Sequence, residues 1–172
     1  MHPDPKKVKA LLSAEGRPSN LFDVRSVLGK FNMYRRYIPN YAQIVAPIVA
    51  LTSGHAVSKG KQIKVAWTEI HDEALRKLKE QTIKHAVLTH PNFEEPFYIY
   101  SDASATAIGG VILQEDPKNP KLLRPISFYS KLLSKAERNY STIDREAMAI
   151  FSILETNKCW LQGQRIHEVY PH

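Results

Sequence analysis

The spacing of apolar residues changes once along this chain, and that change limits the folds open to it. Up to about residue 90, apolar residues recur every three or four positions, which is the spacing of one face of an α-helix. From Pro96 onward the spacing becomes two, which is typical of strands with one buried face. We therefore predict an α+β protein whose first part is helical and whose second part contains a sheet.

Helices are predicted in three places before residue 85. Asn20 is a good cap for a first helix that has Asp23 in its first turn and stops near Pro39. Its apolar face comprises Leu21, Val24, Leu28, Phe31 and Tyr34. A second helix covers about residues 41–51, and a third follows Trp67 and Thr68 to about residue 84. The apolar residues of the third helix are Ile70, Ala74, Leu75, Leu78 and Ile83.

Residues 53–64 combine two glycines with three lysines and little apolar content, as flexible connections do. This segment predicts a boundary between a small helical unit, residues 1–62, and a second unit, residues 63–172. The second unit is expected to contain the connecting helix followed by the sheet.

The sheet is predicted to begin as a three-stranded antiparallel meander. In the first strand Phe97 and Ile99 face one way, whereas Tyr98, Tyr100 and Asp102 face the other. A second strand covers residues 107–114, a turn covers 115–123, and a third strand covers 124–130. Because proline cannot donate to a central ladder, Pro125 predicts an edge position for the third strand.

A long helix and a short fourth strand are predicted after the meander. Ser134 and Glu137 form a capping-box pattern, so the helix is expected to run from there to about Lys158. Its predicted apolar face comprises Tyr140, Ile143, Ala147, Ile150 and Leu154. The fourth strand covers residues 166–170.

Positive charge is concentrated in the first half of the chain. Residues 1–90 hold 15 Lys or Arg against 7 Asp or Glu, whereas residues 91–172 hold 9 against 10. Such asymmetry favours a polyanionic partner, most simply nucleic acid, although a solvated basic surface without a partner has the same composition. The candidate phosphate contacts are Arg25, Lys30, Arg35, Arg36, Lys59, Lys61 and Lys64.

Two carboxylates form the candidate catalytic pair. Asp102 ends the first strand, and Glu146 lies on the predicted inner edge of the long helix. A helix packed on a small sheet can bring two such groups together, and close carboxylates favour a shared divalent cation such as Mg²⁺. The alternative is structural: Asp102 caps a turn and Glu146 hydrogen-bonds to it.

The remaining sequence features narrow the cellular setting. The single cysteine, Cys159, excludes an internal disulfide and agrees with a reducing compartment. No apolar run reaches the roughly 18 residues of a membrane helix, and the N-terminus has no apolar stretch typical of a secretory signal. We therefore expect an intracellular protein, cytoplasmic or nuclear, without a membrane partner.

Several ordered blocks of the sequence carry a family resemblance. Residues 24–40 resemble the thumb segment of gypsy-type LTR retrotransposon reverse transcriptases. The match continues through further blocks in the same order, namely residues 46–51, 67–68, 78–79, 86–88, 100–104, 108–114, 125–130 and 137–146. The chain thus resembles part of a Pol polyprotein, comprising a thumb, a connection and the first part of an RNase H-like domain.

The resemblance implies functions for the residues singled out above. In that family two Mg²⁺ ions are held by four acidic ligands, two of which map onto Asp102 and Glu146. These ions serve hydrolysis of the RNA strand of an RNA–DNA hybrid, and the thumb holds the duplex. The implied partners are therefore an RNA–DNA hybrid or duplex nucleic acid and the remainder of a Pol polyprotein.

The resemblance also predicts that this chain alone is inactive. The polymerase palm lies upstream in the family, and Pro171 stands here where the third acidic ligand is expected. We therefore expect an RNase H-like fragment or relic without turnover. The alternatives are a noncatalytic nucleic-acid-binding module that uses the basic first half, and a poorly stable remnant with no function.

Overall fold

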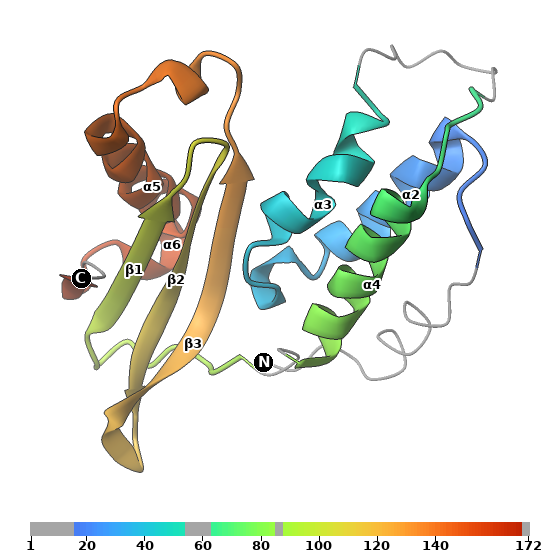
Figure 1. Ribbon diagram of the computed structural model, residues 1–172. Coiled ribbons are helices and arrows are strands. Elements are labelled where there is room, and N and C mark those ends of the chain that lie inside the picture. Colours follow the sequence, from blue (N-terminus) through green and yellow to red (C-terminus); the bar gives the residue numbers. More distant parts are fainter. Residues whose placement is uncertain (1–15, 54–62, 85–87, 170–172) are drawn as a thin grey trace.

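The computed structural model describes residues 16–53, 63–84 and 88–169, which form a helical unit beside a sheet unit (Figure 1). The helical unit contains α2 (Leu21–Asn32), the 3₁₀ helix η1 (Arg35–Tyr37), α3 (Tyr41–Ala50) and α4 (Glu69–Lys84). The sheet unit contains β1 (Phe97–Ala103), β2 (Ala107–Asp116), β3 (Asn119–Leu132), η2 (Glu137–Asn139), α5 (Thr142–Thr156), α6 (Lys158–Leu161) and β4 (Ile166–Val169). The predicted α+β class is confirmed.

The first helix begins where its cap was predicted. The side chain of Asn20 accepts a 2.9 Å hydrogen bond from the backbone N–H of Asp23, so it satisfies a donor that the helix itself cannot pair. From this start α2 turns Val24 and Phe31 into the core of the helical unit. Ile48 of α3 and Leu78 of α4 are fully buried in the same core. The predicted boundary at residue 62 lies outside the described residues. Helix α4, which was expected in the second unit, packs on α3 in the helical unit.

The buried face of α4 differs from the predicted one. Ile70 and Ile83 are 67% and 61% exposed, whereas Ala74, Leu78 and Thr82 are buried. Thr82 can occupy a buried position because its hydroxyl donates a 2.7 Å hydrogen bond to the carbonyl oxygen of Leu78. A hydroxyl paired within its own helix packs like a small apolar group, and a pattern of apolar letters alone misses it.

The sheet has the strand order β3-β2-β1-β4. Strands β1, β2 and β3 form the predicted antiparallel meander, and β4 pairs with β1 in parallel. Strand β3 lies at an edge, as Pro125 predicts. The predicted turn at residues 115–123 is too long, because Asp116 accepts a 2.8 Å hydrogen bond from the N–H of Lys118 and closes a tight turn before β3 begins at Asn119.

Helix α5 starts later than predicted. Ser134 and Glu137 do form the capping contacts, with the Ser134 N–H donating to the Glu137 carboxylate at 2.7 Å, but these contacts support only η2. Tyr140 is extended, and Ser141 then caps α5 by accepting a hydrogen bond from the N–H of Asp144. The capping pattern therefore marks a short turn that precedes the long helix.

The face that α5 turns to the sheet also differs from the prediction. Ile143 is 77% exposed and Tyr140 is 48% exposed, whereas Ala149 and Ile153 are fully buried. Ile153 belongs to a core that contains four inward-facing strand residues, Phe97, Ile99, Ile112 and Ile126. The apolar residues of α5 surround the helix, so packing against the sheet selects which of them become buried.

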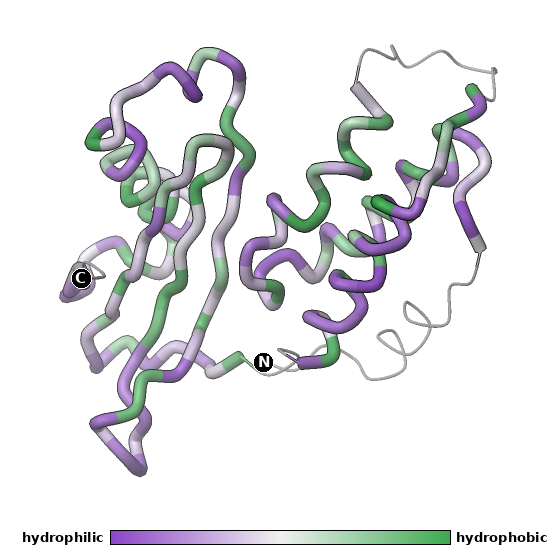
Figure 2. Tube along the Cα trace, in the orientation of Figure 1, coloured by the Kyte–Doolittle hydropathy of each residue, from purple (hydrophilic) through white to green (hydrophobic). Residues whose placement is uncertain are grey.

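The helical unit lies against the other side of the meander (Figure 1). The N–H of Ala42 donates a buried 2.9 Å hydrogen bond to the Ser130 hydroxyl, and an Arg35 Nη2 donates to the Ser130 carbonyl oxygen at 2.9 Å. Figure 2 shows hydrophilic residues at the β2–β3 turn and along much of α4. None of the helices in the described part of the chain is long and apolar enough to cross a bilayer.

Candidate functional site

Asp102 lies near the carboxyl end of β1, on the sheet face that α5 does not cover. Phe97 and Ile99 alternate with it and are buried beneath α5. Asp102 pairs with Gly109 across β2, and Gly109 pairs with Ser130 across β3. Because Ser130 bonds to the start of α3, this row of residues faces the helical unit.

An open pocket of about 230 Å³ lies beside Asp102. It is bounded on one side by Asn40 and Gln43 from the start of α3, and on the other by Asp102 and Phe128. The Oε1 atom of Gln43 is buried without a hydrogen-bond partner among the described residues. The carboxylate therefore borders an open hollow.

Glu146 lies in the first half of α5 and is exposed. The preceding residue, Arg145, donates from Nη1 to the carbonyl oxygen of Ser104 at 3.0 Å, which attaches this part of α5 to the chain immediately after β1. Arg145 also donates to the hydroxyl of Thr142 on its own helix. Glu146 is thus anchored near the end of the strand that carries Asp102, although it does not lie on the buried helix face where it was predicted.

The turn-capping role considered as the alternative for Asp102 belongs to Ser104. Ser104 closes the β1–β2 turn: its hydroxyl donates to the carbonyl oxygen of Ala107 at 2.9 Å and accepts from the N–H of Ala107 at 3.0 Å. Within the described ranges, neither the Asp102 carboxylate nor the Glu146 carboxylate forms a hydrogen bond or an ion pair. Turn capping therefore does not account for Asp102.

The metal-binding capacity of the described residues is limited. No group of three or more His, Cys, Asp or Glu side chains among residues 16–53, 63–84 and 88–169 could hold a metal ion. Asp102 projects from the sheet face that meets the helical unit, whereas Glu146 projects from α5, which packs on the opposite face. Their joint site stays a prediction. Pro171, which stands at the expected position of a third ligand, lies outside the described residues.

The predicted phosphate contacts fall into distinct structural settings. Lys30 is exposed and lines an open groove of about 270 Å³ between α2 and α4, while Lys64 is exposed and forms an isolated β-bridge with Asn20. Arg25 is partly buried on α2. Arg35 and Arg36 lie where the helical unit meets β3 of the sheet unit. Lys59 and Lys61 lie outside the described residues.

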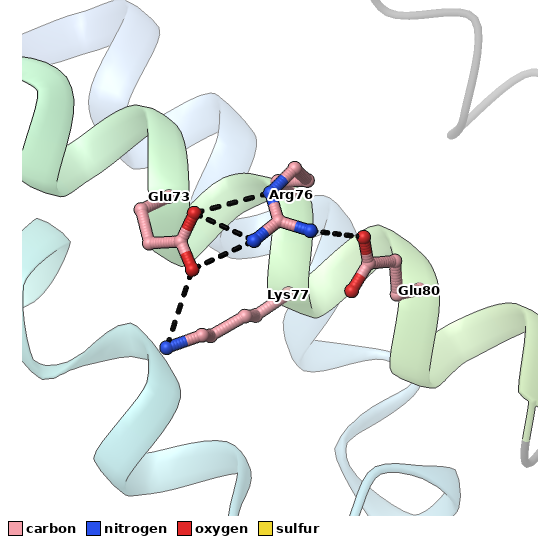
Figure 3. Close-up of polar contacts among 4 residues, drawn as sticks. All are labelled: Glu73, Arg76, Lys77 and Glu80. Carbon is pink, nitrogen blue, oxygen red and sulfur yellow. Dashed lines mark hydrogen bonds and ion pairs between the residues drawn. The ribbon is translucent and has the colours of Figure 1, made fainter.

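Two cations on α4 are already neutralised within the helix. On the outer side of α4, Arg76 bonds to both Glu73 and Glu80, and Lys77 pairs with Glu73 at 3.3 Å (Figure 3). These contacts lower the pKa of Glu73 and raise that of Arg76. Because their charges are balanced within one helix, these cations are poorer phosphate contacts than Lys30.

Comparisons with known proteins place the chain in a family. Residues 67–167 match the family described as the RNase H-like domain found in reverse transcriptase. The chain is 33% identical over 171 residues to the Pol polyprotein of transposon opus from Drosophila melanogaster, covering 97% of this chain. It is 36% identical over 167 residues to that of transposon gypsy from the same organism, covering 94% of this chain. The chain spans 17% and 15% of these relatives.

A solved structure shares the fold. The foamy viral protease–reverse transcriptase dRH in complex with double-stranded DNA superposes with a TM-score of 0.80 at 20% sequence identity, over 99% of this chain and 28% of that one. The superposition includes both the helical unit and the sheet unit. The fold is therefore shared, and the family match over residues 67–167 shows that this chain belongs to the family of RNase H-like domains found in reverse transcriptases.

Proposed function

We propose that the chain serves within a longer Pol polyprotein as its thumb and the first part of its RNase H-like domain. In this role the helical unit binds the backbone of an RNA–DNA hybrid or duplex through Arg25, Lys30, Arg35, Arg36, Lys59, Lys61 and Lys64. Asp102 and Glu146 supply two of the carboxylates that the RNA-cleaving site requires. The single observation that carries this proposal is that both carboxylates are unpartnered and anchored near the end of β1.

The donor chemistry of the two residues suits Mg²⁺. Carboxylate oxygens are the ligands that this ion prefers, and both side chains lack competing protein partners in the described part of the chain. Bound Mg²⁺ would activate water and stabilise the leaving oxygen in phosphodiester hydrolysis. The part played by the chain is to hold the two carboxylates in place, and the Arg145–Ser104 hydrogen bond supports the placement of Glu146.

The proposal includes inactivity of this chain on its own. Two carboxylates are too few to enclose two metal ions, and the described residues add no further acidic or histidine ligand. The decisive assay incubates the full chain with a labelled RNA–DNA hybrid and Mg²⁺. We expect binding without cleavage, and cleavage that is lost in Glu146→Gln would overturn the claim of inactivity.

The carboxylate pair can be tested without turnover. Mn²⁺ added to the ¹⁵N-labelled chain should broaden amide resonances near Asp102 and Glu146 first, because it is a paramagnetic ion that binds oxygen ligands. Asp102→Asn and Glu146→Gln should each abolish this selective broadening. Glu155→Gln, at the other end of α5, is the matched control. Selective broadening that persists in both variants would contradict the assignment of Asp102 and Glu146 as metal ligands.

A noncatalytic nucleic-acid-binding module is the second candidate. It is favoured by the excess of Lys and Arg over acidic residues in positions 1–90 and by the exposed, unneutralised Lys30. Phosphate contacts release counterions, so affinity for duplex should fall steeply between about 50 and 200 mM salt. A flat salt response would reject both this module and the duplex-holding part of the first proposal.

A further inference from the structure

A pocket of about 420 Å³ lies where η1 meets the edge strand β3 and the segment between α5 and α6. Its lining brings together three cations, Arg35, Arg36 and Lys131, and four side chains that carry a hydroxyl or an amide, Ser127, Tyr129, Thr156 and Asn157. No carboxylate belongs to the lining. The pocket is separate from the hollow beside Asp102, with which it shares only Phe128.

The two arginines are held in place by neutral groups. Arg35 donates from Nη2 to the carbonyl oxygen of Ser130 at 2.9 Å, and the guanidinium of Arg36 lies 5.0 Å from the centre of the Trp160 ring. Trp160 in turn packs against the core beneath α5. A carbonyl oxygen and an indole face orient a guanidinium without cancelling its charge.

Two other arginines are instead balanced by carboxylates. Arg76 is balanced by two glutamates, and Arg124 by Asp116. In the described residues neither Arg35 nor Arg36 has a carboxylate within ion-pair distance, whereas Lys131 pairs with Glu137 at 2.6 Å. The pocket therefore keeps the positive charge of two oriented guanidinium groups.

A nearby hydroxyl is available for a ligand. Ser127 is 2% exposed. Its hydroxyl lies 3.4 Å from the carbonyl oxygen of Phe128, which is long for a hydrogen bond. Buried hydroxyls ordinarily form a shorter bond. A ligand oxygen in the pocket would give the Ser127 hydroxyl that bond.

We propose that this junction pocket binds a phosphate group. Guanidinium groups recognise phosphate oxygens through paired, charge-assisted hydrogen bonds, and a hydroxyl adds a neutral donor. Phosphate would also join the two units, because Arg35 and Arg36 come from the helical unit and Ser127 from the sheet unit. The proposal rests on the proposed function only for the source of the phosphate, which is either a nucleic-acid strand or a free phosphate compound.

The two tryptophans allow a direct test in the full chain. Inorganic phosphate is titrated at constant ionic strength while the indole N–H resonances of Trp160 and Trp67 are followed by NMR, with chloride as the reference anion. Trp67 donates to Asp72 in the helical unit and serves as an internal control. We expect a saturable shift of the Trp160 resonance and none for Trp67. An unsaturable shift, or an equal one with chloride, would overturn the proposal.

Substitutions separate binding from nonspecific attraction. By calorimetry, Arg36→Gln should lower the association constant for phosphate roughly tenfold or more, and Ser127→Ala should lower it about threefold to tenfold while leaving every charge in place. Arg165→Gln, near the opposite edge of the sheet, removes the same charge and should leave the constant unchanged. Thermal melts confirm folding of each variant. Equal losses in Arg165→Gln, or none in Ser127→Ala and Arg36→Gln, would reject a built site.

A short DNA duplex and inorganic phosphate distinguish the two sources. If the phosphate belongs to a nucleic-acid strand, the duplex shifts the Trp160 resonance and inorganic phosphate competes with it. Lys30→Gln should then weaken duplex binding but leave phosphate binding intact. Binding of inorganic phosphate alone supports the pocket and assigns it to a free phosphate compound, while the proposed function fails. If Arg36→Gln does not weaken duplex binding and inorganic phosphate does not bind, the pocket proposal is overturned while the proposed function stands.

Discussion

Gly109 and Gly110 are neighbours in β2, yet they meet opposite environments on the two faces of the sheet. A Cβ atom at Gly110 would lie 2.5 Å from the carbonyl oxygen of Tyr100 and would collide with Ile153 of α5. A Cβ atom at Gly109 would meet only ordinary contacts, the nearest being Asn40 Oδ1 at 3.5 Å. The face beneath α5 is closely packed, whereas the face toward the helical unit keeps a hollow.

This difference explains where chemistry is possible in the sheet unit. Side chains under α5 are committed to a core with no space for a ligand. Asp102 lies in the same row as Gly109, on the face with the 230 Å³ pocket, and so remains accessible. The packed face supplies stability, and the open face can carry a site without disturbing it.

The largest effect on stability is expected from removing a buried side chain on the packed face. Ile153→Ala should lower the free energy of unfolding by about 2–5 kcal/mol, because it removes a fully buried side chain and leaves a cavity. Ile143→Ala on the same helix is the matched control, since Ile143 is 77% exposed, and should change it by less than about 0.5 kcal/mol. Urea unfolding measures both. Similar losses would show that α5 does not pack through Ile153.

The glycine pair tests the contrast directly. Gly110→Ala should destabilise the protein by about 1–3 kcal/mol, because the Tyr100 carbonyl is backbone that cannot move without disturbing β1 and the buried Ile153 side chain must repack. Gly109→Ala should cost clearly less, since its new methyl group fits at van der Waals distance. Thermal melts of the two variants suffice. Equal destabilisation would mean that both faces are equally tight.

The Ser130 hydroxyl forms a buried hydrogen bond between the sheet and the helical unit. Ser130→Ala should cost about 1–3 kcal/mol, because the buried N–H of Ala42 loses its partner. Ser127→Ala on the same strand removes only a 3.4 Å contact and should cost less. Hydrogen exchange at Ala42 provides the local readout, and unchanged protection in Ser130→Ala would contradict the assigned bond.

The smallest effect concerns pH. The Lys131 ammonium, followed by the N–H and hydroxyl of Ser134, lowers the pKa of Glu137 from 4.5 to about 2. A carboxyl group with a lowered pKa stabilises the folded state above its unfolded pKa, so this contribution is complete above about pH 4.5 and is lost as the pH falls toward 2. Acid titration of stability should show less slope across that window in Glu137→Gln. An unchanged slope would remove Glu137 from the acid response.

Local signals in the sequence predicted much of the architecture. Asn20 and Asp23 marked the start of α2 correctly, because a cap and the first turn that it bonds to are neighbours in the sequence. Alternation in β1 placed Ile99 and Asp102 on opposite faces, and Pro125 marked an edge strand. The family resemblance then singled out Asp102 and Glu146 as candidate metal ligands, which spacing alone did not distinguish from a turn cap, and their joint site stays a prediction.

Long-range contacts decided what these signals could not. The burial of Thr82 depends on a bond to Leu78, and the buried face of α5 depends on the space above Gly110. The positions of the Arg35 and Arg36 side chains depend on contacts with Ser130 and Trp160, which lie about 95 and 124 positions further along the chain. No local pattern records such a partner.

The sequence by itself therefore determined the order and type of most elements, the basic first half and the identity of the candidate carboxylates. These properties follow from neighbouring residues, from composition or from resemblance. Only the tertiary structure decided which face of each helix is buried, which sheet face stays open beside Asp102, and which arginines meet at the junction. The reason is physical: periodicity expresses what each segment can bury, whereas close packing between distant segments selects what it does bury.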